Sequence, residues 1–120
     1  MDKLDKIFEM QSFLDEKIAR ERNLKFSKEE WIQKEVLAMI SELSEVLDEV
    51  NFKWWKNKKE INDDQLKEEI VDLLHFLISM SLKAGMSAEE IFSIYMKKNE
   101  ENIKRQEGKT EKEGYLPLPD

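Results

Sequence analysis

Residues 27–50 read SKEEWIQKEVLAMISELSEVLDEV, and this stretch decides the fold class. Ser27 stands three residues before Glu30, a pattern in which a hydroxyl and a glutamate cap the first turn of a helix. The stretch contains neither glycine nor proline, so we predict a helix that runs to about Val50. Its apolar residues recur every three or four positions, as on one face of a helix: Ile32, Val36, Met39, Ile40, Leu43, Val46, Leu47 and Val50.

The segments on either side predict two more helices and a loop. Residues 2–22 carry apolar side chains at spacings of three and four, which indicates a first helix. Residues 51–62 break the period, so we expect a loop there. Ser87 and Glu90 repeat the capping pattern and predict a last helix that runs to about Gln106.

A further helix is predicted between the loop and this last helix. Asn62 or Asp63 can cap its start, and Gly85 can end it. Between residues 73 and 82 it is apolar on nearly every side. We therefore expect it to be the central, buried helix.

Length and composition agree with an all-α domain. The chain has 120 residues, of which 40% are hydrophobic and 39% charged, with only three glycines and two prolines. A turn-rich β-sandwich or a glycine-looped dinucleotide fold needs more of these residues. We predict a bundle of four to five helices over residues 1–107 and a flexible tail over residues 108–120.

The charge balance and the rarest residue types exclude several classes of function. The chain has no cysteine, which excludes disulfides and thiol chemistry, and one histidine, His75. Its net charge of −7 argues against nucleic-acid and anionic-membrane partners. The start of the chain lacks the apolar run of a signal peptide, and no apolar stretch is long enough to span a bilayer. We expect a cytoplasmic protein.

Two pairs of acids indicate a metal site. Glu42 and Glu45 lie three apart on one predicted helix, and Glu69 and Asp72 lie three apart on another. Residues at this spacing share a helix face, so each helix can offer two carboxylates to one point. Oxygen ligands of this kind suit Mg²⁺ or Mn²⁺.

The alternative interpretation is that these acids belong to solvated helix faces. The chain has 27 acids, so two glutamates three apart are common. The apolar arc of residues 27–50 centres near Leu43, with Glu42 at its edge and Glu45 nearly opposite. Glu69, however, projects into the apolar arc of the predicted central helix. A buried carboxylate is costly unless it is paired or binds a cation.

Basic residues follow the first acid pair and recur on the last helix. Residues 51–60 read NFKWWKNKKE, an aromatic and basic loop that can stack a base and neutralise phosphates. The alternative is a solvated connector with its tryptophans packed in the core. On the last helix, Lys98, Asn102 and Arg105 continue the face that begins with apolar residues.

These motifs together resemble a known family. The acid pairs, separated by 23 residues, resemble the ExxE…ExxD metal motif of the all-α NTP pyrophosphatases, the MazG-like superfamily. The chain is most similar to the dimeric dUTPases (dUTP diphosphatases) within it. Four further stretches carry that similarity: Met10–Asp15, Phe52–Lys56, Asp72–Phe76, and Lys98, Asn102, Arg105 and Gln106 with Gly114 and Tyr115.

The resemblance implies a homodimeric enzyme of the all-α NTP pyrophosphatase type. It implies Mg²⁺-dependent hydrolysis of dUTP, and of dUDP as a further substrate, with dUMP and pyrophosphate as the products of dUTP. This activity serves nucleotide-pool sanitation and the supply of a dTMP precursor. The four acids would be catalytic and hold Mg²⁺, for which Mn²⁺ can substitute, and Glu42 would also orient or deprotonate the attacking water. The substrate-binding residues that it implies are Gln11, Asp15, Trp55, Lys56, Lys98, Asn102, Arg105 and Tyr115.

Two other functions stay open on the sequence. One is a MazG-like pyrophosphohydrolase that acts on another nucleoside triphosphate, such as dCTP. The other is a helical interaction module without catalytic activity, for which the acids are surface residues. His75 is expected to be a structural or surface histidine rather than a base.

Overall fold

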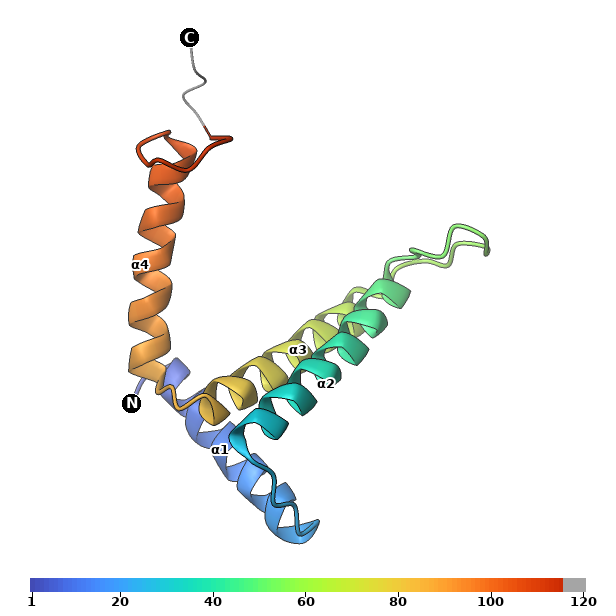
Figure 1. Cartoon of the computed structure of the whole chain (residues 1–120). Helices are drawn as coiled ribbons and strands as arrows, with labels where there is room; N and C mark the ends of the chain where they lie inside the picture. Colours follow the sequence, from blue (N-terminus) through green and yellow to red (C-terminus); the bar gives the residue numbers. More distant parts are fainter. Residues whose placement is uncertain (116–120) are drawn as a thin grey trace. The chain divides into compact units, whose positions relative to one another are not determined.

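The computed structural model describes residues 1–115, which form four α-helices (Figure 1). They are α1 (Lys3–Glu21), α2 (Lys28–Glu49), α3 (Asp63–Lys83) and α4 (Ala88–Gln106). The described residues contain no β-strand, so the predicted all-α fold is confirmed. The bounds differ from the predicted ones by no more than about two residues, the usual uncertainty at frayed helix ends.

Side-chain caps explain where the helices begin. Ser27 and Glu30 form the predicted reciprocal pair, with both side-chain-to-backbone hydrogen bonds at 3.2 Å. Asn62 caps α3, and Ser87 caps α4 by accepting a hydrogen bond from the backbone N–H of Glu90 at 3.1 Å. Gly85 follows the end of α3 with a φ of +87°, a left-handed conformation that glycine adopts without a Cβ clash.

The chain divides into two compact units, Met1–Met86 and Ser87–Asp120. In the first unit α3 packs against both α1 and α2, and Figure 1 shows α2 and α3 side by side. Phe8 of α1 and Ile78 of α3 are buried there. Polar side chains are buried beside them: Gln11, Glu35, Glu69, Ser79 and Ser81. A buried polar group needs a partner, so this interior is where a site can form.

The packed face of α2 is not the one that the apolar arc predicts. Leu43, expected at the centre of that face, is 49% exposed, whereas Glu35 is buried and Glu42 half-buried. The face of α2 that carries its acids meets α3, and five of the eight residues of the apolar arc are left on the surface. We call these exposed residues the α2 apolar stripe: Val36, Ile40, Leu43, Leu47 and Val50.

The third helix is central but not buried on every side. It lies in contact with both other helices of its unit, and Ile78, Ser79 and Ser81 are buried. Ile70 is nevertheless 51% exposed and Leu74 is 39% exposed. The expectation of full burial was wrong because two neighbouring helices cover only part of a helix surface.

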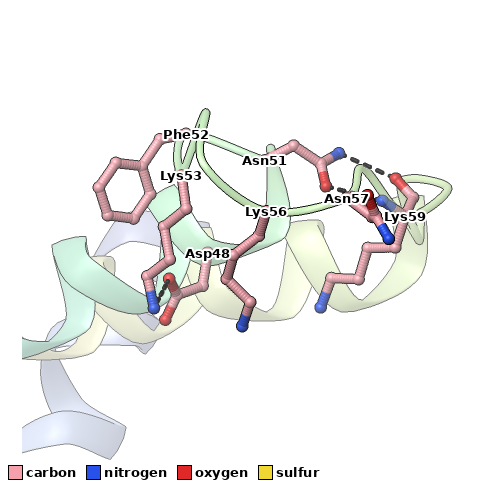
Figure 2. A pocket seen from close by; sticks show the side chains of 7 residues that line it. All are labelled: Asp48, Asn51, Phe52, Lys53, Lys56, Asn57 and Lys59. Carbon is pink, nitrogen blue, oxygen red and sulfur yellow. Dashed lines mark hydrogen bonds and ion pairs between the residues drawn. The ribbon is translucent and has the colours of Figure 1, made fainter.

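The loop between α2 and α3 is held together by Asn51. Its side-chain amide donates to the carbonyl of Lys59 at 2.9 Å and accepts from the N–H of Lys59 at 3.0 Å. Figure 2 shows Lys53, Lys56 and Lys59 lining a cavity of about 300 Å³ beside this closure.

The two tryptophans of this loop lie at the surface. Trp54 is 85% and Trp55 is 60% exposed, and their rings pack edge-to-face with centroids 4.7 Å apart. The alternative that places them in the core is therefore wrong. Both rings present apolar surface to solvent or to a partner.

The second unit contains α4 and the start of the predicted tail. Arg105 pairs with Glu101 at 2.6 Å and donates to the side chain of Asn102 at 3.4 Å. Residues 107–115 lie outside any helix, and residues 116–120 of the predicted tail lie outside the described part of the chain. The boundary expected at residue 107 stays a prediction.

Across residues 1–115, every helix taken alone is too short or too polar to cross a membrane. Only α3 and α4 taken together, with a break between them, meet the length and composition required.

Candidate active site

Four acids from α2 and α3 meet in the first unit. Glu42, Glu45, Glu69 and Asp72 each offer a carboxylate oxygen, and these oxygens all lie within 4.8 Å of one another. The three-residue spacing puts each pair on one helix face, and the antiparallel packing of the two helices brings the pairs together. We call this group the acid cluster.

The acid cluster has oxygens without partners. Glu69 is buried; its Oε1 accepts from Gln65 Nε2 at 2.7 Å, but its Oε2 is buried with no hydrogen-bond partner among the described residues. The Oε2 of Glu42 is in the same condition. Two buried, unpartnered carboxylate oxygens cost free energy that a cation between them would recover.

The crowding of carboxylates in the acid cluster raises the pKa of one of its members. A hydrogen bond with Glu69, together with the negative charges of Glu42 and Glu69, raises the pKa of Glu45 to about 7. Below about pH 7, Glu45 therefore carries a proton. A cation that binds the acid cluster there would have to displace it. Its donor set of carboxylates alone fits a hard divalent cation such as Mg²⁺ or Mn²⁺.

A cavity of about 460 Å³ extends from the acid cluster between the three helices. Glu42 and Asp72 line it together with apolar and aromatic side chains, among them Trp31 and Phe76. Its volume lies in the usual range for small-molecule sites. The polar residues that complete its lining are Gln11, Asp15, Glu35, His75, Ser79 and Lys83.

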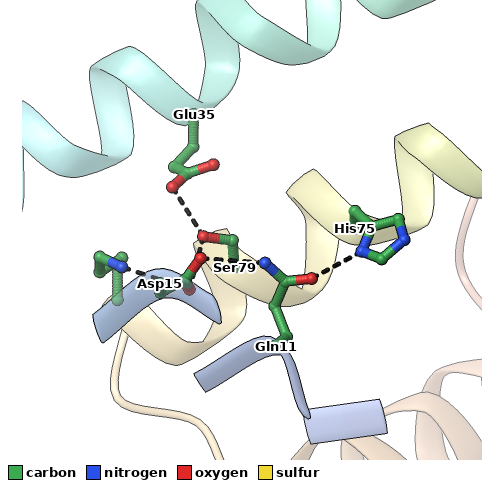
Figure 3. Close-up of polar contacts among 6 residues, drawn as sticks. Gln11, Asp15, Glu35, His75 and Ser79 are labelled. Carbon is green, nitrogen blue, oxygen red and sulfur yellow. Dashed lines mark hydrogen bonds and ion pairs between the residues drawn. The ribbon is translucent and has the colours of Figure 1, made fainter. Parts of the chain in front are cut away.

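Those polar residues form a hydrogen-bonded network (Figure 3). Asp15 accepts from Gln11 Nε2 at 2.9 Å, from Ser79 Oγ at 2.8 Å and from Lys83 Nζ at 3.4 Å. Ser79 Oγ also lies 2.7 Å from Glu35 Oε1. At the other end, Gln11 Oε1 lies 2.8 Å from His75 Nδ1, so the expected structural role of His75 agrees with its contacts.

Glu35 and Lys83, two charged residues of this network, have different surroundings. Burial raises the pKa of Glu35 above its ordinary value, and the negative charge of Asp15 adds to that rise; the hydrogen bond with Ser79 and the charge of Lys83 oppose it. The ammonium of Lys83 lies 4.6 Å from the ring centroid of Trp31, a cation–π contact that fixes its position.

The Glu35–Ser79 contact of this network and the acid cluster lie along one seam between α2 and α3. Glu35 stands seven residues before Glu42 on α2, and Ser79 stands seven residues after Asp72 on α3. Seven residues are about two helical turns, or about 10 Å. Because the helices run antiparallel, moving seven residues back along α2 and seven residues forward along α3 reaches residues that face each other again. These are Glu35 and Ser79.

Only part of the predicted site is brought together in the first unit. Gln11, Asp15, Glu42 and Asp72 line the 460 Å³ cavity, and Glu45 and Glu69 complete the acid cluster. Trp55 and Lys56 lie on the loop after α2 and are not among the residues lining that cavity. The remaining predicted residues belong to the second unit, where Arg105 and Tyr115 are half-buried and Lys98 and Asn102 exposed.

Sequence reasoning missed the other half of the cavity. It did not single out Glu35, Ser79, Lys83 or Trp31, which all line it. A signal was available, because Glu35 and Ser79 repeat the faces of Glu42 and Asp72 two turns away. Reading the acid pairs as part of a longer seam would have found both.

Comparison with known proteins gives consistent relatives. A family model described as dUTPase matches residues 3–86, which span α1 to α3. A dCTP pyrophosphatase of Enterobacteria phage T4 is 38% identical over 88 residues, covering 62% of this chain and 52% of that protein. A dCTP pyrophosphatase of Enterobacteria phage LZ5 is 43% identical over 68 residues, covering 47% of this chain and 40% of that protein.

A third relative is a protein of phage T4 named DNA replication protein, 38% identical over 80 residues that cover 55% of this chain and 20% of that protein. The chain thus spans about half or less of the length of these curated relatives. No solved structure matches the chain.

Proposed function

Because the chain belongs to the dUTPase family, whose model matches residues 3–86, we propose that it is a nucleoside triphosphate pyrophosphohydrolase that converts dUTP to dUMP and pyrophosphate. The observation that carries this proposal is the acid cluster, with two buried, unpartnered oxygens, at the edge of a cavity with aromatic walls. Phosphates need a cation, and a base needs an apolar cavity with a few polar groups.

In this proposal the acid cluster holds Mg²⁺, or Mn²⁺ in its place. When bound, the cation neutralises phosphate charge and polarises the attacking water. Glu42 orients that water and accepts its proton. The water oxygen bonds to phosphorus, the phosphoanhydride bond between the α and β phosphates breaks, and pyrophosphate leaves with the bonding electrons.

The other polar residues bind the substrate. Gln11 reads the uracil edge with the N–H and the lone pair that Asp15 and His75 leave free. Lys56, Lys98 and Arg105 offset the charge of the triphosphate, and Trp55, on a loop outside the cavity lining, packs against the nucleotide once it is bound. Asn102 donates to sugar or phosphate, and Tyr115 contacts the nucleotide from the tail. dUDP is a further substrate of the same site.

A second candidate substrate is dCTP. Two of the relatives are named dCTP pyrophosphatase. The polar part of the cavity is also rich in acceptors, since Asp15 and Glu35 both line it, and the exocyclic amine of cytosine is a donor.

We further propose that the protein acts as a homodimer in the cytoplasm, where it would sanitise the nucleotide pool and supply a dTMP precursor. The α2 apolar stripe supports the dimer. Its five residues are each 41% to 57% exposed along one helix face, an apolar surface of the kind that interfaces cover.

Product analysis tests the proposed activity. The protein is incubated with dUTP, dCTP and the other deoxynucleoside triphosphates, with and without Mg²⁺, and the products are separated by ion-exchange chromatography. We expect dUMP and pyrophosphate from dUTP, and no turnover after chelation. A clear preference for dCTP would show that dCTP, and not dUTP, is the substrate. Absence of any turnover and of Mg²⁺ heat in calorimetry would favour the helical interaction module.

A further inference from the structure

The contacts of Ser79 require a proton that two ionised carboxylates do not have. Its Oγ lies 2.8 Å from Asp15 Oδ2 and 2.7 Å from Glu35 Oε1. A serine hydroxyl has one hydrogen, and an ionised carboxylate only accepts. Both contacts are hydrogen bonds only if one of the two carboxyl groups is protonated and donates to Ser79.

The surroundings assign that proton to Glu35. Asp15 on α1 already accepts from Gln11 and from the ammonium of Lys83 on α3, so toward Ser79 it is again an acceptor and not the donor. Glu35 on α2 is 7% exposed, and Ser79 is its one hydrogen-bond partner among the described residues. Burial raises the pKa of Glu35, in the same direction as the geometry.

Asp15, which accepts in each of its contacts, also sets the direction of the other hydrogen bonds in the network. Gln11 must turn its amide nitrogen toward Asp15, so its carbonyl oxygen faces His75. The hydrogen on His75 must then be at Nδ1. Hydrogen bonds therefore run from Glu35 through Ser79 to Asp15 on one side, and from His75 through Gln11 to Asp15 on the other.

We propose that Glu35, as a neutral carboxylic acid, binds the base of the nucleotide and positions the side chains around it. It holds Ser79, and through it Asp15 and Gln11, in the orientation that reads the base edge. Its second oxygen, which Figure 3 shows pointing away from Ser79, accepts an N–H of a pyrimidine. This role rests on the proposed function, because it takes the 460 Å³ cavity to be the nucleotide site.

Loss of the proton from Glu35 would remove the hydrogen bond that orients Ser79. Glu35 and Asp15 would then both be acceptors for the single hydrogen of Ser79, and among the described residues only Lys83 lies beside them with a positive charge. Glu35 lies about two helical turns from Glu42 of the acid cluster, so nucleotide binding is affected and the chemical step is not.

Kinetics as a function of pH test the positioning role. KM and kcat for dUTP and dCTP are measured for the wild type, Glu35→Gln, Glu35→Ala and the control Glu29→Gln, an exposed acid on the first turn of α2. Above the pKa of Glu35 the wild-type KM should rise up to about tenfold per pH unit, as the neutral fraction falls, while kcat stays level.

The variants should separate the two states of Glu35. Glu35→Gln, whose amide donates to Ser79 at every pH, should show a KM without this rise. Glu35→Ala should have a raised KM throughout, and the control should follow the wild type. A pH-dependent KM in Glu35→Gln that matches the wild type would overturn the proposal, as would a high KM equal to that of Glu35→Ala.

Infrared difference spectroscopy tests the proton without a substrate. Subtraction of the Glu35→Gln spectrum from that of the wild type should leave the carbonyl band of one protonated carboxyl group near neutral pH. In Asp15→Asn this band should titrate at lower pH, because a neighbouring negative charge is gone. An absent band overturns the proposal whatever the activity.

The kinetic and infrared measurements distinguish failure of the proposed function from failure of the role proposed for Glu35. If no nucleotide binds or turns over while the band is present, the proposed function and the positioning role both fail, but the protonated state of Glu35 stands. If nucleotides turn over with a wild-type KM that does not change with pH, the proposed function stands and the positioning role fails.

Discussion

Gln65 donates a 2.7 Å hydrogen bond from its Nε2 to Oε1 of Glu69, one turn further along α3. This contact holds one oxygen of a buried carboxylate and leaves the other, Oε2, without a partner beside Glu42. The arrangement is that of a ligand oriented for a cation by a neighbouring side chain.

Replacement of Glu69 by glutamine should abolish Mg²⁺ binding. The substitution keeps the shape of the side chain but removes the most buried negative charge of the acid cluster. Isothermal titration calorimetry with MgCl₂ should show no binding heat. The control is Glu68→Gln, an exposed neighbour on the same helix, which should bind as the wild type does. Equal heats for the two variants would exclude Glu69 as a ligand.

Replacement of Gln65 by leucine should weaken Mg²⁺ binding without abolishing it. The carboxylate of Glu69 would lose the donor that orients it, and losses of this kind cost about ten- to a hundredfold in metal affinity. The same calorimetric titration measures the change. An unchanged Kd would mean that packing alone orients Glu69.

Magnesium affinity should rise with pH up to about pH 7 and then level off. The pKa of Glu45 is raised to about 7, so below that pH a cation must displace a proton from the acid cluster. Calorimetry in two buffers of different ionisation enthalpy should show proton release on Mg²⁺ binding near neutral pH. Glu45→Gln should bind without this release, and release of the wild-type amount by that variant would assign the proton to another group.

Loss of the cap at the start of α2 should destabilise the protein. Ser27→Ala removes the acceptor of the 3.2 Å hydrogen bond from the N–H of Glu30, which should lower the free energy of unfolding by about 1 kcal/mol. Urea denaturation measures the difference. Ser41→Ala, at an exposed position within the same helix, should not be destabilised, since alanine favours helices.

A charge in the α2 apolar stripe should dissociate the proposed dimer. Leu43 is 49% exposed at the middle of the stripe, and Leu43→Glu should weaken dimerisation about tenfold or more in sedimentation velocity. Ser41→Glu adds the same charge outside the stripe and should leave the dimer intact. A wild-type protein that stays monomeric at high concentration would contradict the assembly itself.

Local signals predicted the helices well because their caps are local. Ser27 with Glu30, and Asn62 before α3, act within one turn and do not depend on the rest of the fold. The acid pairs were likewise found from spacing within each helix. That the four acids meet depends on α2 and α3 packing together, which only the structure shows.

What the sequence could not predict depends on how the helices are rotated against each other. The apolar arc of α2 was expected to face the core, yet Leu43 is exposed and Glu35 buried. Hydrophobic periodicity identifies an apolar face but not what covers it, and in this structure the acid-bearing face of α2 is the one that meets α3. The pairing of Glu35 with Ser79 was missed for the same reason, because it exists only in one register. The roles of Lys98, Asn102, Arg105 and Tyr115 stay predictions.

The helix repeat fixes the distance between the two ends of the seam between α2 and α3. The two turns between Glu35 and Glu42, matched by the two turns between Ser79 and Asp72, are set by backbone geometry. A single residue inserted between Glu35 and Glu42 would rotate one end by about 100° relative to the other and lengthen the span by about 1.5 Å. The distance between the two ends of the cavity can therefore change only by whole residues, each of which also turns one end away from the other. The helix repeat thus fixes the length of ligand that can reach both ends.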